Sequence, residues 1–248
     1  MSSALFSLAT VGEVGDDFFK ERTSDTLPCQ ARSNEVFCFD WARENIDRFG
    51  TPTLQHLELV LLSLALGFAV AFALSLLAHR NAWLRPPLLA GTGVLYTIPS
   101  IAFFFLLIPI TGLGRTTAII VLAAYTLQII YRNTMLGLAN VPNSVKDAAR
   151  GMGMTERQIL WRVELPLATP EIIGGLRIAV LSTVAIATLA VFISAGGLGT
   201  QIYGGGNLTF PTSIIIAAAI VIAMALVFDV MLLAVKRLTT PWQRARLG

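Results

Sequence analysis

The sequence predicts an all-α polytopic membrane protein with five transmembrane helices, and three observations support this fold class. Of its 248 residues 55% are hydrophobic and only 13% are charged, which is too apolar for a soluble domain. Five stretches reach the roughly 20 apolar residues that a helix needs to cross a bilayer. The basic residues behind the net charge of +3 lie at the ends of these stretches and not on one face, which argues against nucleic-acid binding.

The predicted spans are Leu57–Ala78, Leu88–Ile110, Thr116–Leu136, Ile172–Ala195 and Thr212–Val235. Basic residues follow the first, third and fifth spans, for example Arg80, Lys146 and Lys236, whereas only Arg115 lies between the second and third. Lys and Arg accumulate on the cytoplasmic side of membrane proteins. We therefore expect a cytoplasmic C-terminus with a basic tail at 241–248 and, with an odd number of spans, an N-terminus outside.

Residues 1–52 form a polar, mainly acidic extension that suits the outer face. Within it, Asp40–Gly50 predicts a short amphipathic helix, capped by Asp40, ended by Gly50-Thr-Pro52, and lying on the outer membrane surface as an elbow. Cys29 and Cys38 are the two cysteines, and outside the cell they are candidates for a disulfide. Two free thiols without a role are the alternative.

A metal site is not expected, because the two histidines, His56 and His79, flank opposite ends of one span. In the first predicted span, small residues recur at every fourth position and predict close approach of another helix. These residues are Ser63, Gly67, Ala71 and Ser75.

Pro99 interrupts the second predicted span. Because proline removes one backbone hydrogen bond, it predicts a kink whose freed carbonyl is satisfied by a neighbour or by a water-filled path. A purely structural kink is the alternative to a kink that serves a pathway.

The fourth span ends in a glycine-rich segment, Ser194–Gly206, where the backbone can turn tightly and approach other elements. A phosphate cradle is not expected there, since no Lys-Ser/Thr follows. Three ionisable residues lie inside or at the edge of the membrane: Arg132, Arg177 and Asp229. We expect Asp229 to pair with Arg177 or Arg132, because an unpaired charge is costly there. A structural pair is preferred to a proton relay.

The polar segment from Ser144 to Pro170 lies between two apolar spans and must therefore project into water. It predicts two short helices. The first begins at Ser144, with Asp147 at the capping-box position, and stops at Gly153; the second is capped by Thr155 with Gln158 and ends at Pro166. This knob is either a docking surface for another protein or an ordinary solvated loop.

Asp147-Ala-Ala, Gly151 four residues after Asp147, and Leu165-Pro166 resemble the EAA motif of ABC-importer permeases, with Asp where that family usually has Glu. The resemblance implies that 137–171 is a cytoplasmic coupling loop that fits a cleft on an ATPase subunit. The implied coupling residues are Asp147, Ala148, Ala149, Gly151, Gly153, Thr155, Leu165 and Pro166.

Three further stretches resemble the osmoprotectant branch of these permeases: Thr97–Ser100, Ile108–Gly114 and Tyr131–Thr134. The resemblance covers about residues 53–240. The glycine-rich segment after the fourth span looks like the outer scoop-shaped loop that is shared with methionine and sulfonate permeases.

The resemblance implies a type I importer permease in a bacterial cell membrane, which would carry glycine betaine or related quaternary amines. Its implied partners are a second permease subunit, identical or homologous, two ATPase subunits that hold ATP and Mg, and an extracellular binding protein. This chain would bind no cofactor, because none of its lysines, Lys20, Lys146 and Lys236, lies in a GxxxxGK[ST] loop.

Quaternary ammonium groups are held by aromatic faces. The pathway candidates are Tyr96, Pro99, Ser100, Phe103, Tyr125 and Phe192, and packing within the bundle is the alternative for the aromatic ones. A methionine- or sulfonate-type permease is the nearest alternative function. A secondary transporter would show two related halves, and an intramembrane enzyme would need nucleophile or metal residues that the spans lack.

Overall fold

A computed structural model describes residues 37–207 and 210–240 of the chain. The described part is helical and has no strand. Cys29 lies outside the described residues, so its pairing with Cys38 stays a prediction. Four helical stretches are long and apolar enough to cross a membrane, and the number rises to five if one sharply bent helix pair counts as a span.

The order of elements follows the predicted spans closely. Those before the coupling loop are α3 (Phe39–Asn45), a 3-10 turn (Ile46–Phe49), α4 (Gly50–Arg80), a 3-10 turn (Ala82–Leu84), α5 (Arg85–Thr97), α6 (Ser100–Thr111) and α7 (Arg115–Ala139). Those after it begin with α8 (Asn143–Gly151), α9 (Glu156–Ile159), a π turn (Leu160–Glu164), α10 (Leu165–Ala187), a 3-10 turn (Thr188–Ile193), α11 (Gly199–Asn207) and α12 (Pro211–Thr239).

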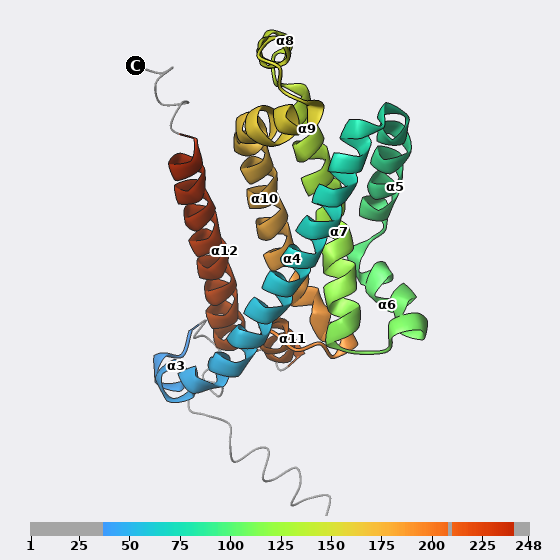
Figure 1. Ribbon diagram of the computed structural model, residues 1–248. Coiled ribbons are helices and arrows are strands. Elements are labelled where there is room, and N and C mark those ends of the chain that lie inside the picture. The colour runs from blue at the N-terminus through green and yellow to red at the C-terminus, as the bar shows by residue number, and fades with distance from the viewer. Residues whose placement is uncertain (1–36, 208–209, 241–248) are drawn as a thin grey trace, which may run out of the picture.

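Helix α7 is the centre of the bundle, with α4 and α10 packed against it along most of its length (Figure 1). Helices α5 and α6 cover another side of α7, and α12 packs against α10 and α11. In Figure 1, α8, α9 and the C-terminal ends of α4 and α12 lie at one end of the molecule, while α3 and α11 lie at the other. The ends that carry the predicted cytoplasmic charges therefore meet on one side.

Small residues allow α4 and α7 to approach each other closely. All four members of the predicted stripe on α4, from Ser63 to Ser75, are buried. A Cβ added to Gly67 would lie 2.9 Å from the carbonyl oxygen of Ala123 and would overlap the Thr126 hydroxyl. The predicted stripe is confirmed as a helix contact, and Gly67 is its tightest point.

The second predicted span is not one kinked helix, which corrects the expectation from sequence. Helices α5 and α6 meet at 100°, with Ile98 and Pro99 in extended conformation between them. The carbonyl of Ile98, which the break leaves without a helical partner, accepts a hydrogen bond from the Tyr125 hydroxyl of α7. The expectation that a neighbour would satisfy the freed carbonyl is thus confirmed, and the bend is larger than a proline kink alone.

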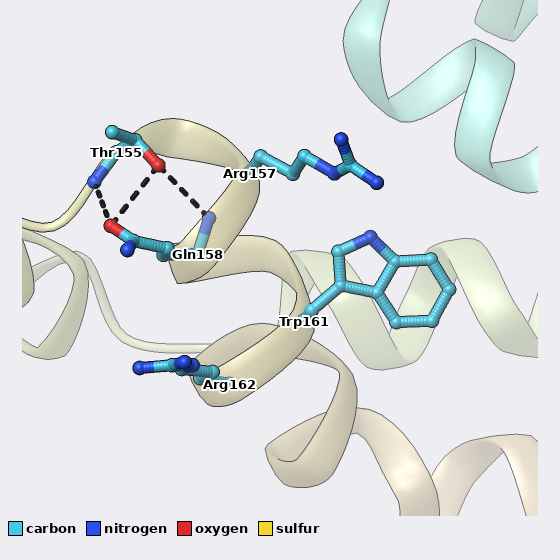
Figure 2. A pocket seen from close by; sticks show the side chains of 5 residues that line it. All are labelled: Thr155, Arg157, Gln158, Trp161 and Arg162. Atoms are coloured by element: carbon cyan, nitrogen blue, oxygen red, sulfur yellow. Dashed lines mark hydrogen bonds between the residues drawn. The ribbon is translucent and has the colours of Figure 1, made fainter.

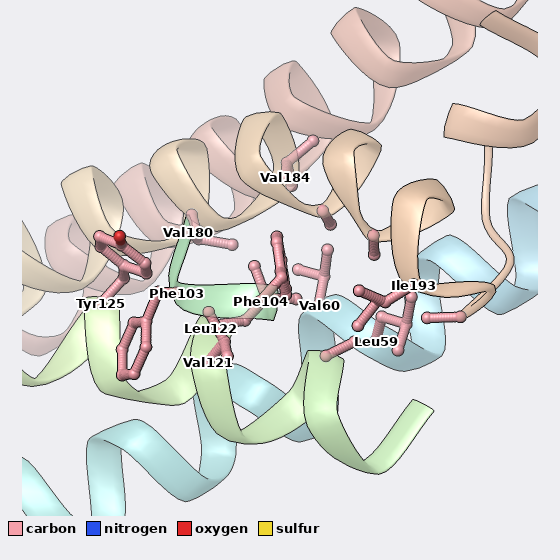
Figure 3. Close-up of a cluster of buried hydrophobic side chains, with 14 residues drawn as sticks. Leu59, Val60, Phe103, Phe104, Val121, Leu122, Tyr125, Val180, Val184 and Ile193 are labelled. Atoms are coloured by element: carbon pink, nitrogen blue, oxygen red, sulfur yellow. The ribbon is translucent and has the colours of Figure 1, made fainter. Parts of the chain in front are cut away.

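The bent α6 completes the largest hydrophobic core (Figure 3). Phe104 is fully buried there against residues of α4, α7 and α10, including Leu59, Leu122 and Val184. Ile193, at the end of the 3-10 turn that follows α10, closes the same cluster. Since this core joins four of the long elements, it fixes their relative positions in the half of the bundle away from α8.

Two predicted helix boundaries in the N-terminal part were wrong. The elbow helix begins at Phe39 after Cys38 and not at a cap formed by Asp40. Gly50-Thr-Pro52 does not stop the chain's helix, because these residues form the first turn of α4, where proline needs no backbone donor. The elbow and the first span are therefore nearly continuous.

In the coupling loop, α8 begins at Asn143 after Pro142, so Ser144 is not its cap. Pro166 does not end the second helix either: α9, the π turn and α10 run on without a break from Glu156 to Ala187. Pro166 lies in the first turn of α10, immediately after the wider π turn, where the loss of one backbone donor is tolerated.

The substitution Gly67→Ala tests the α4–α7 contact. We expect it to destabilise the protein by about 1–3 kcal/mol, because the new methyl group must displace the Thr126 side chain and the backbone near Ala123. Thermal unfolding in detergent measures the effect. The matched control is Gly91→Ala in α5, where a Cβ meets nothing within 4 Å; an equal loss in both variants would contradict the close contact.

Candidate functional site

The knob formed by α8 and α9 projects from one end of the bundle (Figure 1). The turn between the two helices uses Gly153 at φ +77°, a conformation that favours glycine. Thr155 then caps α9 in a complete capping box: its hydroxyl accepts from the Gln158 backbone N–H, and its own N–H donates to the Gln158 side chain at 2.8 Å (Figure 2). The predicted cap and turn are confirmed.

The residues that resemble the EAA motif divide into an exposed set and a buried set. Asp147, Ala148 and Gly151 are exposed on α8, whereas Ala149 is buried against the rest of the knob. Leu165 lies within the apolar cluster at the base of the knob, and Pro166 lies beside it at the start of α10. Of these residues, Asp147, Ala148 and Gly151 on α8 are therefore the exposed ones, and Leu165 packs inside the bundle.

Arg150 ties the two helices of the knob together. Its guanidinium pairs with Asp147 at 3.0 Å and with Glu156 of α9 at 2.9 Å. The hydrogen bond from Arg150 lowers the pKa of the Glu156 carboxyl below its ordinary value. Only the Glu156 pair crosses from α8 to α9, and because both pairs are exposed each contributes little to stability.

Arg157 and Trp161 point to the same side of the second helix, and Arg162 points elsewhere (Figure 2). With Thr155 and Gln158 these residues line a pocket of about 320 Å³. Trp161 also lines an apolar groove with Phe72 of α4 and Leu165 of α10. The side of the knob is thus polar near α8 and apolar where it meets the bundle.

A buried carboxylate that was not predicted, Glu164, lies at the base of the knob. It is the last residue of the π turn, and its two oxygens pair with His79 of α4 and Lys146 of α8, each at 2.8 Å. Sequence analysis did not bring these three residues together. The available signal was the acid directly before Leu165-Pro166.

The intramembrane ion pair forms between α10 and α12. The Arg177 guanidinium donates two hydrogen bonds to Asp229, Nε to Oδ1 and an Nη to Oδ2, both at 2.7 Å. Arg132 is exposed on α7, and Asp229 pairs with Arg177 instead. The bidentate geometry is the strongest form of this interaction, and it fixes the otherwise sparsely packed α12 against α10.

Three of the four aromatic pathway candidates lie together near the α5–α6 bend. The Tyr125 ring contacts both Tyr96 and Phe103, with ring centroids 5.8 and 5.9 Å apart. Tyr125 and Phe103 are buried in the main core, whereas Tyr96 is 45% exposed. Pro99 and Ser100 form the bend itself. Among these three aromatic side chains, Tyr96 is therefore the most exposed.

Phe192 lies apart from this group, near the glycine-rich segment. Its ring meets that of Tyr203 on α11, with centroids 5.2 Å apart, and both are partly exposed. Gly196 and Gly197 turn with φ of +84°, and a Cβ on Gly199 would overlap the Thr188 carbonyl. Gln55 of α4 accepts a hydrogen bond from the Gly197 N–H at 3.1 Å. The predicted tight turn and close approach are confirmed.

Sequence comparison adds to this geometry. Residues 63–241 match the family described as binding-protein-dependent transport system inner membrane component. The osmoprotectant import permease protein OsmW of Salmonella typhimurium is 36% identical over 203 residues, which cover 80% of this chain and 94% of OsmW. The choline transport system permease protein OpuBD of Bacillus subtilis is 35% identical, over 82% of this chain and 88% of OpuBD. The carnitine transport permease protein OpuCB of Listeria monocytogenes is 38% identical, over 75% and 86%.

Structure comparison agrees on the fold. A chain of the inward-facing MetNI methionine ABC transporter superposes with a TM-score of 0.72, over 77% of this chain and 96% of that one, at 23% sequence identity. A chain of an amino acid ABC transporter crystallised with histidines gives a TM-score of 0.70, over 81% and 98%, at 20% identity.

Asp229→Asn tests the intramembrane pair. We expect a lower thermal midpoint and a lower membrane yield, because the Arg177 guanidinium loses the charge that compensates it. The double variant Arg177→Met with Asp229→Met should recover most of the loss, since neither charge then remains. If the double variant were as unstable as Asp229→Asn, the two residues would not act as a pair.

Proposed function

Because the chain belongs to the family of binding-protein-dependent transport system inner membrane components, we propose that it is the translocation subunit of an ABC importer for quaternary-amine osmoprotectants. The observation that carries the proposal is the α8–α9 knob, which ends the bundle on one side and presents Asp147 and Ala148 to a partner. Such a surface on a membrane-embedded bundle suits a chain that receives work from another polypeptide.

The proposed topology treats the bent pair α5 and α6 as one span, which makes five spans with α4, α7, α10 and α12. The N-terminus and the extension 1–52 then lie outside, and the coupling loop and the tail 241–248 lie in the cytoplasm. The distribution of basic residues supports this orientation. Residues 53–240 form the permease domain.

The proposed partners follow from the family. A second permease subunit, identical or homologous, would complete the pathway, and two ATPase subunits would supply ATP, Mg and the ATPase site. A binding protein outside the cell would deliver the solute. We place the ATPase contact at the exposed residues of α8, with Leu165 and Pro166 transmitting the load into α10.

Quaternary amines are preferred to methionine as the substrate for a specific reason. The relatives at 35–38% identity are named for osmoprotectant, choline and carnitine transport, whereas the likeness to the methionine transporter is 23% identical and concerns the fold. A methionine- or sulfonate-type permease remains the alternative within the class. A secondary transporter is disfavoured, because it would need neither an ATPase nor the α8–α9 knob.

Uptake of labelled glycine betaine, choline, carnitine and methionine by proteoliposomes holding the assembled importer tests the substrate class. We expect uptake of at least one quaternary amine, dependent on ATP and on the binding protein. Uptake of methionine alone would overturn the substrate assignment, and uptake without any ATPase would overturn the importer assignment.

Ala148→Trp tests the docking surface. We expect it to abolish copurification of the ATPase, because a bulky side chain on the exposed face of α8 prevents close contact. Pull-down of the ATPase from detergent-solubilised membranes measures this. Asn81→Trp is the matched control, since Asn81 is exposed at the same end but lies outside the knob. Equal retention of the ATPase by both variants would move the docking surface elsewhere.

Tyr96→Leu tests the aromatic contact with the substrate. If the ring attracts the cation, its loss should reduce uptake of the quaternary amine by about 2- to 30-fold, as expected for a cation–π contact of roughly 0.5–2 kcal/mol. Tyr96→Phe is the control, because it keeps the ring and removes only the hydroxyl, and it should transport normally. Unchanged uptake by Tyr96→Leu would place the pathway contact elsewhere.

A further inference from the structure

The base of the α8–α9 knob contains a buried carboxylate that is shared between a histidine and a lysine from different helices. The Glu164 side chain is 6% exposed; its Oε2 lies 2.8 Å from Nε2 of His79, and its Oε1 lies 2.8 Å from Nζ of Lys146. The His79 and Lys146 side chains are themselves mostly shielded, at 20% and 16% exposed. Both carboxylate oxygens are thus occupied away from bulk water.

This arrangement differs from the other ion pairs of the knob. Arg150, Asp147 and Glu156 are at least half exposed, so water competes for their charges. A carboxylate that is removed from water depends on its partners, because its desolvation is offset only while they stay in place. Separating Glu164 from His79 or Lys146 is therefore unfavourable, whereas the Arg150 pairs can open readily.

The three residues belong to three separate elements. Lys146 lies on α8 beside Asp147, His79 lies in the last turn of α4, and Glu164 ends the π turn that leads into α10. π turns within helices are frequently found at functional sites. Glu164 therefore joins the exposed helix of the knob to two of the long helices at one point.

Two further sets of contacts stiffen the same junction. Leu76 and Phe72 of α4 pack in one apolar cluster with Leu160 of the π turn and Leu165 of α10. The Arg85 guanidinium donates to the carbonyls of Ala78 and His79, which fixes the end of α4 to the start of α5. The end of α4 is thus held against the π turn by the apolar cluster as well as by the His79–Glu164 contact.

We infer that Glu164 is a positioning residue that makes α8 and the cytoplasmic end of α4 move together with α10. Displacement of α8 by the ATPase then reaches α4 through Lys146, Glu164 and His79, and it reaches α10 through the Lys146–Glu164 pair, because Glu164 directly precedes α10 in the same helical run. The inference rests on the proposed docking of an ATPase on α8. It assigns to Glu164 a role in transmission and not in docking.

A role in transmission and a role in docking predict different effects on the amount of solute carried per ATP. Glu164→Gln keeps the side-chain shape but removes the negative charge and replaces one of the two oxygens that contact His79 and Lys146 with an amide nitrogen. The knob itself keeps its capping box at Thr155 and its Arg150 pairs, so it should still bind the ATPase. Hydrolysis should then continue while α4 no longer follows, and the amount of solute carried per ATP should fall.

The experiment uses the importer assembled from this chain, its ATPase and its binding protein in proteoliposomes, with solute uptake and ATP hydrolysis measured in parallel. For Glu164→Gln we expect at least about a fivefold fall in solute per ATP, with unchanged copurification of the ATPase. Glu58→Gln is the matched control, because Glu58 forms an exposed ion pair with Arg115, and it should leave the ratio unchanged. Where Glu164→Gln fails to assemble, His79→Gln at a partly exposed position serves in its place.

A covalent bridge separates transmission from a general loss of structure. In a Glu164→Gln chain that also carries Cys29→Ser and Cys38→Ser, a short thiol cross-linker between His79→Cys and Lys146→Cys would join α4 to α8 without the carboxylate. We expect cross-linking to restore solute per ATP. A ratio that is unaltered by Glu164→Gln, or that is not restored by the bridge, would overturn this inference alone. Failure of the unaltered chain to bind any ATPase would overturn the proposed function and this inference with it.

Discussion

The structure depends most on the continuity of one helix. From Glu156 the chain runs through α9, the π turn and α10 to Ala187 without a loop, although it contains Pro166 and Pro170. A helix transmits displacement along its axis because each residue is hydrogen-bonded to the turns on either side. The α9 half of the knob is therefore continuous with a membrane helix, so a load placed on α9 reaches the interior of the bundle.

Close packing around α7 determines how that load can spread. Gly67 of α4 lies against Thr126, Gly137 of α7 lies against Ala168, and Gly175 of α10 lies against Asn133. Contacts this close leave little room for sliding, because interiors packed to this density resist deformation. By contrast, α12 is sparsely buried and is fixed to α10 by the Arg177–Asp229 pair. Helices α4, α7 and α10 thus form a stiff unit, and α5, α6 and α12 surround it.

The sequence allowed prediction of most features that depend on local chemistry. The apolar spans, the small-residue stripe on α4, the Thr155 capping box and an arginine partner for Asp229 all follow from patterns within a few turns or from the cost of a charge in lipid. Helix boundaries such as the Asp40 and Ser144 caps were misplaced by one or two residues, and the larger errors arose where contacts beyond the local pattern decide the outcome. At the 100° bend near Pro99, the Tyr125 hydroxyl of a different helix donates a hydrogen bond to the Ile98 carbonyl. Pro166 fits within a continuous helix because a π turn precedes it. The Glu164 cluster brings together residues 85 positions apart, which no local pattern records.

The rigidity of the helical segment from Glu156 to Ala187 can be measured directly in the assembled importer. Spin labels on Arg157→Cys in α9 and Ile178→Cys in α10 would report the distance between the two ends of this segment, and both positions are exposed. If the segment moves as a rod, this distance stays the same in the nucleotide-free and ATP-bound states. A shift of several ångströms between the states would show a hinge near Pro166 and would contradict direct transmission from the knob into the membrane.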